Sequence, residues 1–162
     1  MRLYALAASL VLIASPVAAQ PGGAHVAEVS VDIGPRLEAK AHDYGQRDLD
    51  GLAADLRRTV ERELVRHGRA GREGVSLHLV ITDAKPNRPT FEQLGARPGL
   101  SMRSIGIGGA SISGEEIGPN GRRPVSYSFW ETDIRNERGA ATWSDAERAF
   151  DLFARQYATG RR

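Results

Sequence analysis

Alternating apolar and polar residues predict two strands in the first half of the chain. In "HVAEVSVDIGP" the alternation covers residues 26–33, and Gly34 with Pro35 ends it. In "GVSLHLVITDA" the alternation runs over residues 75–81 and leaves His78 on the more polar side. A period of two residues is typical of a strand that buries one of its faces.

Two longer segments show the spacing of amphipathic helices. In "LDGLAADLRRTVERELVRHG" leucine and valine recur three or four positions apart over residues 49–64, and Gly68 ends the pattern. Alanine and aromatic residues recur in the same way over residues 146–157. Ser144 and Glu147 predict a capping box at the start of this second helix.

A long connection rich in proline and glycine, "KPNRPTFEQLGARPGLSMR", follows the second strand. Within it, Thr90 and Gln93 predict a capping box over one helical turn that ends near Gly95. Connections of this length are usually functional or mobile. The region 85–103 is therefore a candidate binding surface.

The glycine-rich stretch "SIGIGGASISGEEIGPNG" predicts a bulged strand followed by a hairpin. Its apolar positions shift register across Gly108–Gly109, which indicates a bulge. Asn120–Gly121 stands between two alternating runs, and this pair is typical of a tight turn whose central residues need positive φ. The return strand "PVSYSFWETDI" then places Trp130 on the same polar face as Ser126 and Ser128.

The first residues, "MRLYALAASLVLIASPVAAQPGG", are typical of a cleaved export signal. Arg2 precedes an apolar run, small residues follow Pro16, and cleavage after Ala19 fits the pattern. The alternative is an uncleaved membrane anchor, but Ser15 and Pro16 interrupt a run that would need about 20 apolar residues. We expect a periplasmic or secreted protein with no stable membrane span after the signal is removed.

The predicted elements follow the order strand, helix, three or four strands, and helix. Because each strand has one apolar face and each helix one apolar stripe, we expect an α+β fold, in which a mainly antiparallel sheet of four or five strands carries two helices on one face. The 162 residues, 41% hydrophobic and 26% charged, fit one globular domain. We assign a signal peptide to residues 1–19, a leader to 20–25, the domain to 26–158 and a tail to 159–162.

Cysteine content and charge exclude several classes of chemistry. The absence of cysteine excludes disulfides, lipid attachment through a thiol and thiol catalysis. The formal net charge of +2 falls to +1 if Arg2 leaves with the signal, and this near-balance does not indicate a nucleic-acid binder. The four histidines are not spaced like a metal pair. We therefore expect no metal, no cofactor and no nucleic acid.

Known phosphate-binding and nucleophile motifs do not fit the chain. The glycine-rich stretch lacks the third small turn residue and the following helix of a dinucleotide-binding loop, and the Lys-Ser/Thr pair of a P-loop. "GASIS" has Ser113 where a nucleophile elbow has glycine. "DLDG" lacks the later ligands of a calcium loop, so Asp48 or Asp50 is better interpreted as a helix cap.

Trp130 is the leading candidate for a binding residue. An isolated indole on a polar strand face is typical of a binding spot, unless the proline-containing connection covers it. We expect Trp130 and Ser128 to form a surface with the long connection, and this surface to bind another protein of the cell envelope. The residues contributed by the connection would be Arg88, Phe91 and Arg103.

Two alternatives stay open. Arg58, Arg62 and Arg66 form a basic stripe on the long helix that could bind an anionic lipid, although flanking glutamates dilute its field and favour an ordinary solvated face. The other alternative is a small hydrolase or ligand-processing enzyme. It would use His78 or His42 with a carboxylate such as Asp43 or Asp83, but no nucleophile and base stand at a recognisable spacing. A noncatalytic protein is the favoured hypothesis.

Several stretches together resemble small bacterial envelope proteins of unknown function, many of them lipoproteins. The most distinctive are "ITDAKPNRP" and the ending "TWSDAERAFDLFA". Such proteins are similar to the α/β modules of envelope accessory proteins, including the N-terminal domain of the Tol-system protein TolB and curli-secretion lipoproteins. The resemblance implies a periplasmic binding or assembly module and supplies no catalytic residues. The missing lipid-bearing cysteine departs from those lipoproteins and implies a form without a lipid anchor.

Overall fold

The computed structural model describes residues 24–137 and 141–160, and the predicted signal peptide lies outside these ranges. The elements follow one another as β1 (Val26–Ile33), α1 (Pro35–Glu38), α2 (Ala41–Tyr44), α3 (Gln46–Arg66), β2 (Val75–Lys85), α4 (Phe91–Ala96), β3 (Gly109–Gly118), β4 (Gly121–Trp130), the 3-10 turn η1 (Ile134–Glu137) and α5 (Ser144–Thr159).

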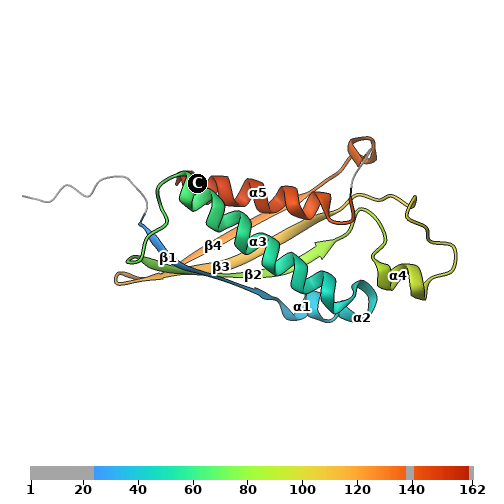
Figure 1. Cartoon of the computed structure of the whole chain (residues 1–162), viewed down its shortest axis with the longest axis horizontal. Coiled ribbons are helices and arrows are strands. Elements are labelled where there is room, and N and C mark those ends of the chain that lie inside the picture. Colours follow the sequence, from blue (N-terminus) through green and yellow to red (C-terminus); the bar gives the residue numbers. More distant parts are fainter. Residues whose placement is uncertain (1–23, 138–140, 161–162) are drawn as a thin grey trace, which may run out of the picture.

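The predicted α+β class is confirmed, and the two long helices lie on one face of the sheet. Four strands pair in the order β1-β2-β3-β4. Strands β1 and β2 are parallel and are joined through α3, whereas β2, β3 and β4 pair antiparallel. Helix α3 packs over β1 and α5 over β3 and β4, side by side (Figure 1). The parallel pairing follows from the long helix between β1 and β2, because such a crossover returns the chain in the same direction.

The hydrophobic core lies between the helices and the sheet. Leu56 of α3, Leu79 of β2 and Phe150 of α5 are almost completely buried there. Burying one such side chain contributes about 1.5–3 kcal/mol, so the apolar stripes of the helices fix which sheet face they cover. Neither of the two long helices lies on the opposite face, which we call the open face (Figure 1).

Glycines 108 and 109 do not form the predicted bulge. Strand β3 begins only at Gly109, and the irregular register lies in β2, between Ile81 and Asp83. Gly108 is instead required by a close approach, because a Cβ there would lie 2.6 Å from the carbonyl oxygen of Lys85. The apolar positions preceding it belong to a loop and not to a strand.

The predicted hairpin is confirmed, but its turn residues differ from the prediction. Gly118 pairs with Gly121, so the two turn residues are Pro119 and Asn120. Gly121, with φ of +107°, is the first residue of β4 and supplies the positive φ. The predicted capping box of Thr90 and Gln93 at α4 is also confirmed.

Both long helices begin differently from the prediction. Helix α3 starts at Gln46 after Gly45, and Asp48 lies within its first turn, where it accepts a hydrogen bond from Trp143 Nε1 (2.8 Å). Helix α5 has Trp143 at its N-cap, so the predicted Ser144 capping box is wrong. The Ser144 hydroxyl instead accepts a hydrogen bond from the backbone N–H of Ala141 (2.7 Å). Of the four or five predicted strands, four are present among the described residues, and residues 141–143 before α5 form no fifth strand.

A polar network ties the end of α5 to the sheet. The Tyr157 hydroxyl donates to Glu116 Oε2 (2.7 Å), and Arg123 pairs with the same carboxylate. Arg69 donates to the carbonyl of Tyr157 and lies over its ring. Partial burial acts to raise the pKa of Glu116, but the hydrogen bonds from Arg123 and Tyr157 outweigh it and hold that pKa below its usual value. Burial, followed by the bond to Glu116, raises the pKa of Tyr157.

Candidate binding site

Small hydroxyl side chains line the open face where β3 and β4 pair beside Trp130. The register places Ser111 opposite Ser128 and Ser113 opposite Ser126 on adjacent strands. Short side chains leave the face flat, so a larger side chain on it stands out. Trp130, at the end of β4, is that side chain, and 38% of it is exposed.

The Trp130 indole is pinned against the sheet. Its Nε1–H group lies 2.9 Å from Ser128 Oγ and 3.2 Å from Ser111 Oγ, and the two hydroxyls are 2.9 Å apart. Gly109 lies opposite Trp130, where a Cβ would come within 2.8 Å of the ring atom Cε3. The ring therefore lies across β3 in a fixed orientation, and binding to it would cost little conformational entropy.

A cavity of about 480 Å³, which we call the sheet-end cavity, opens beside Trp130. Asp83 lies in its wall and is held by Lys40 Nζ at 2.6 Å and by Arg36 Nη2 at 3.3 Å. The size is within the range of ligand sites in proteins. The wall of the cavity is formed by the β1–α1 junction, β2, β3 and β4. The lining residues are Gly34, Pro35, Arg36, Val80, Thr82, Asp83, Ser111 and Trp130.

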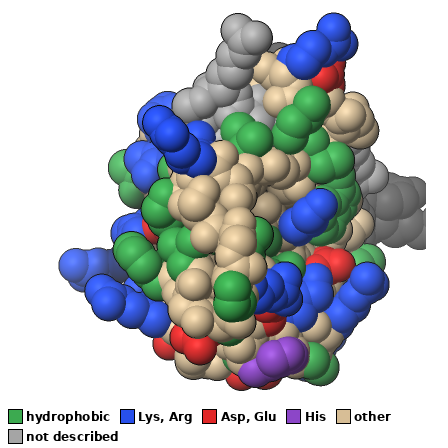
Figure 2. Space-filling view, turned by 90° about the vertical axis from the view of Figure 1, so that its right-hand side faces the viewer, with side chains coloured by type: hydrophobic (Ala, Val, Ile, Leu, Met, Phe, Trp, Pro, Cys, Tyr) green, Lys and Arg blue, Asp and Glu red, His purple; other side chains and the backbone are tan. Residues whose placement is uncertain are grey.

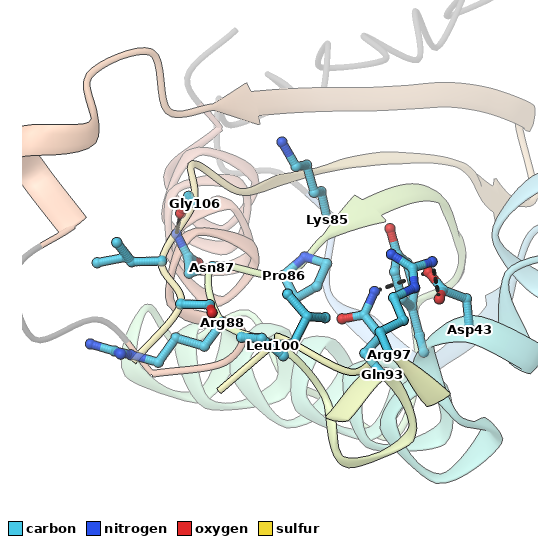
Figure 3. A pocket seen from close by; sticks show the side chains of 13 residues that line it. Asp43, Lys85, Pro86, Asn87, Arg88, Gln93, Arg97, Leu100 and Gly106 are labelled. Atoms are coloured by element: carbon cyan, nitrogen blue, oxygen red, sulfur yellow. Dashed lines mark hydrogen bonds and ion pairs between the residues drawn. The ribbon is translucent and has the colours of Figure 1, made fainter. Parts of the chain in front are cut away.

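A second cavity of about 320 Å³, the loop cavity, lies between the long connection and α2 (Figure 3). Asp43 lies in it and accepts hydrogen bonds from Gln93 Nε2 (2.9 Å) and Arg97, so its charge is compensated. Lys85, at the end of β2, extends away from Asp43 in Figure 3. Because Gly109 pairs with both Lys85 and Trp130, the two cavities are neighbours at one end of the sheet.

Buried hydrogen bonds hold the long connection in place. Asn87 is 1% exposed, and its Nδ2 donates to Asp145 Oδ2 (2.6 Å) and to the carbonyl of Gly106 (3.2 Å). Its Oδ1 accepts from the backbone N–H of Asp145 (2.9 Å). Asp145 Oδ2 also accepts from the backbone N–H of Gly108 (2.9 Å). The connection is therefore anchored to the start of α5.

The surface at this end of the molecule mixes apolar and basic side chains. Figure 2 shows hydrophobic side chains between Lys and Arg side chains, with fewer acidic ones. Outside the strands and the long helices, the exposed large hydrophobic residues of the described chain are Phe91, Met102, Ile105 and Ile134. Aromatic and arginine side chains at a partly apolar surface are typical of protein interfaces.

The predicted site residues are only partly brought together. Trp130 and Ser128 hydrogen bond to each other, and Ser111 and Gly109 complete their surroundings. Arg88 lines the loop cavity, and its Nη1 donates to the carbonyl of Met102 (2.7 Å). Counting pairs outward from the observed turn, Pro119–Asn120, places Gly109 opposite Trp130, whereas the predicted turn at Asn120–Gly121 would have placed Ser111 there.

The other two predicted residues lie on the connection itself. Phe91 is the first residue of α4, with 83% of its side chain exposed. Arg103 is an exposed residue of the loop that follows α4. Among the described residues, no hydrogen bond, ion pair or ring contact joins Phe91 or Arg103 to Trp130.

Each arginine of the basic stripe is paired within the domain. Arg58 contacts Asp55, Arg62 Nη2 lies 3.5 Å from Asp151 Oδ1, and Arg66 Nη1 lies 2.8 Å from Glu63 Oε1. These carboxylates reduce the positive field along α3. The stripe is thus a network of ion pairs on the helix surface.

The histidines do not meet their predicted carboxylates. His42 Nδ1 lies 2.9 Å from the carbonyl of Ala39, while Asp43 and Asp83 are held by cations. His78 instead lies on the open face between two β1 residues, with Nδ1 2.9 Å from Ser30 Oγ and Nε2 3.6 Å from Asp32 Oδ2.

This Ser-His-Asp grouping lacks the geometry of a catalytic triad. The Asp32 side chain is 67% exposed, and 3.6 Å exceeds the reach of a hydrogen bond that would orient the ring. A triad needs a base held in place by a third group, next to a pocket for the reacting carbonyl. None of the three residues lines the sheet-end cavity or the loop cavity.

Within residues 24–137 and 141–160, no group of three or more His, Asp or Glu side chains is arranged to hold a metal ion. In the same ranges, no helix is long and apolar enough to cross a membrane. Comparison of the chain with models of known protein families, with curated proteins and with solved structures gives no match.

Proposed function

We propose that this protein is a noncatalytic, exported binding module that holds another protein of the bacterial cell envelope at the Trp130 end of its open sheet face. The observation that carries the proposal is the pinned indole of Trp130 beside the sheet-end cavity. Fixed aromatic residues next to a pocket are typical anchors of protein interfaces. The expected export signal supplies the compartment, and the absence of cysteine agrees with a module that carries no lipid anchor.

Three features favour binding over catalysis. His78, which lies near a serine and a carboxylate, is on the open face and has no hydrogen bond to the carboxylate of Asp32, which is 3.6 Å away. The carboxylates in the walls of the two cavities, Asp43 and Asp83, are engaged in ion pairs with Arg97 and Lys40 and are not free to act on a substrate. The anchored connection and the pinned indole form a rigid surface, which lowers the entropic cost of association.

Site-specific photo-crosslinking in the cell tests this proposal. A photoreactive residue is placed at Ile105, an exposed residue that lines the loop cavity, and the captured protein is identified by mass spectrometry. We expect one protein to dominate and its capture to fall at least about tenfold in a Trp130→Ala background, as for an interface anchor worth about 2 kcal/mol. Thermal melting checks that the variant folds. Capture that is unchanged by Trp130→Ala would contradict the proposal.

A further inference from the structure

Strand β4 is the last strand of the sheet, and its outer edge has no partner strand in the part of the chain that the structure describes. The hairpin fixes which backbone groups point outward. Gly118 and Gly121 flank the two-residue turn, and the pair next to such a turn shares hydrogen bonds. Along an antiparallel strand, residues whose backbone bonds to the neighbouring strand alternate with residues whose backbone points outward. The N–H and C=O groups of Ser126, Ser128 and Trp130 therefore point away from β3.

The two halves of this edge differ in their protection. In the first half, the backbone of Pro124 also points outward but has no N–H to donate. Arg122, two residues earlier, carries a charge and is paired with Glu115. Proline and charge on an edge strand prevent pairing with other chains. In the second half, from Ser126 to Trp130, the outward positions carry no proline and no charge, so this half is open to another strand.

A groove of about 750 Å³ on the helix side of the sheet is lined by the C-terminal parts of α3 and α5 and reaches β4 at Tyr127. Tyr127 of β4 and Leu152 of α5 line it and are only partly buried, so an added strand would remove apolar surface from water. Arg155 also lines the groove, and its side chain has no ion pair with any described residue. Glu63, the acidic residue that lines the groove, forms an ion pair with Arg66 at 2.8 Å. It therefore does not compensate the charge of Arg155.

We propose that the partner binds by adding an extended segment to β4 along Ser126–Trp130. The proposal rests on the proposed function and specifies how the partner is recognised. The backbone of the segment pairs with the outward groups of β4, and its side chains that face α5 are apolar over Tyr127 and Leu152 and acidic beside Arg155. In strand addition of this kind, backbone hydrogen bonds supply affinity and alternate side chains supply specificity.

A synthetic peptide tests the mode of binding directly. The probe is the blocked peptide Thr-Val-Ser-Val-Thr-Glu-Ser, in which alternate residues match the groove. It is titrated into the isotopically labelled exported protein, and backbone amide shifts are followed by NMR. We expect the largest shifts at the amides of residues 126–130 and at Arg155. Replacing the Glu of the peptide with Gln weakens binding about threefold, as for a partly exposed ion pair.

Two substitutions at one position separate backbone pairing from side-chain contact. Ser126→Pro removes an outward N–H and weakens peptide binding by about tenfold, because a hydrogen bond is lost and the proline ring obstructs the added strand. The matched control, Ser126→Ala, keeps the N–H and binds within about twofold of the original protein. Pro124 shows that β4 accommodates proline at a position whose backbone points outward, and a thermal melt verifies that the variant folds. Arg155→Gln removes the preference for Glu over Gln in the peptide.

The other possible results show whether a partner segment, a second copy of this chain or neither binds the β4 edge. If millimolar peptide leaves the amides of residues 126–130 unchanged, or Ser126→Pro binds as well as Ser126→Ala, strand addition is wrong. A dimer that forms through β4 and disappears in Ser126→Pro assigns the edge to a second copy and also overturns the proposal. Crosslinking from Ile105 distinguishes failure of strand addition from failure of the proposed function. If capture persists in Ser126→Pro but is lost in Trp130→Ala, the proposed function stands and strand addition is wrong. Capture that survives Trp130→Ala rejects the proposed function itself.

Discussion

Asn87→Ala tests the claim that buried hydrogen bonds anchor the long connection beside the binding surface. The substitution removes hydrogen bonds from Nδ2 to Asp145 and to Gly106, and one from the N–H of Asp145 to Oδ1. Since the site is almost completely buried, water does not readily replace these bonds. The Asp145 carboxylate would retain the backbone N–H of Gly108 as a partner.

The magnitude follows from the groups left unsatisfied. Each buried polar group that loses its partner costs about 1–3 kcal/mol, and the retained bond to Gly108 limits the loss at the carboxylate. We therefore expect Asn87→Ala to lower the free energy of unfolding by about 3 kcal/mol. For a domain of this size, about 3–4 °C of melting temperature corresponds to 1 kcal/mol, so the melting temperature should fall by about 10 °C.

Thermal unfolding followed by circular dichroism measures this change, with a surface control. Met102→Ala removes an exposed side chain from the same connection and should change the free energy of unfolding by less than about 0.5 kcal/mol. If Asn87→Ala melts within about 2 °C of the original protein, the connection is not anchored by this network and the reasoning fails.

Three further changes test other parts of the account. Gly109→Ala would bring a methyl group within 2.4 Å of the Phe129 carbonyl oxygen and 2.8 Å of Trp130, so we expect the end of β4 and the indole to move and the fluorescence maximum to shift. Gly106→Ala, where a Cβ has open space, is the control, and equal spectra would refute the contact. Tyr157→Phe removes a hydrogen bond to Glu116 and should cost about 1–2 kcal/mol near pH 7. Because the folded-state pKa of Glu116 is lowered, its contribution is present above the unfolded pKa of about 4.3 and is lost as pH falls through the folded value. Melting against pH should therefore converge for the two proteins in acid, and a constant difference would contradict this assignment. Replacing the basic stripe with Gln should leave binding to anionic vesicles at physiological salt unchanged, because its arginines are paired; a large loss would restore the lipid hypothesis. The stripe consists of Arg58, Arg62 and Arg66.

Periodicity was a good guide to the elements that bury one face. The strand over 26–33, the long amphipathic helix and the C-terminal helix follow directly from apolar spacing, because burial against a common core imposes these periods. The capping box of Thr90 and Gln93 also followed from local chemistry. The parallel pairing of β1 and β2 depends on the crossover and was less apparent from the residues themselves.

Local signals failed where a distant contact decided the structure. Ser144 has the sequence of a helix cap, but the packing of Trp143 against Tyr44 and its bond to Asp48 place Trp143 at the N-cap. Gly108 was interpreted as a bulge, whereas it is required by the approach of the chain to Lys85. Such long-range contacts leave no mark in the neighbouring residues.

The candidate site shows the same division between local and distant information. The polar alternation placed Trp130 and Ser128 on one strand face, as the structure has them. The sheet-end cavity could not be anticipated, because the β1–α1 junction reaches Trp130 only through the order of all four strands. The buried link between Asn87 and Asp145 likewise joins residues far apart in the sequence.

The most direct test of the central claim compares crosslinking from two positions in the cell. One photoreactive residue replaces Trp130 itself and preserves an aromatic ring there. The other replaces Arg57, an exposed residue of α3, which lies on the opposite side of the sheet (Figure 1). The account predicts that one envelope protein is captured from position 130 and is absent from position 57. Equal capture from both positions, or capture from position 57 alone, would show that the open face is not the binding surface.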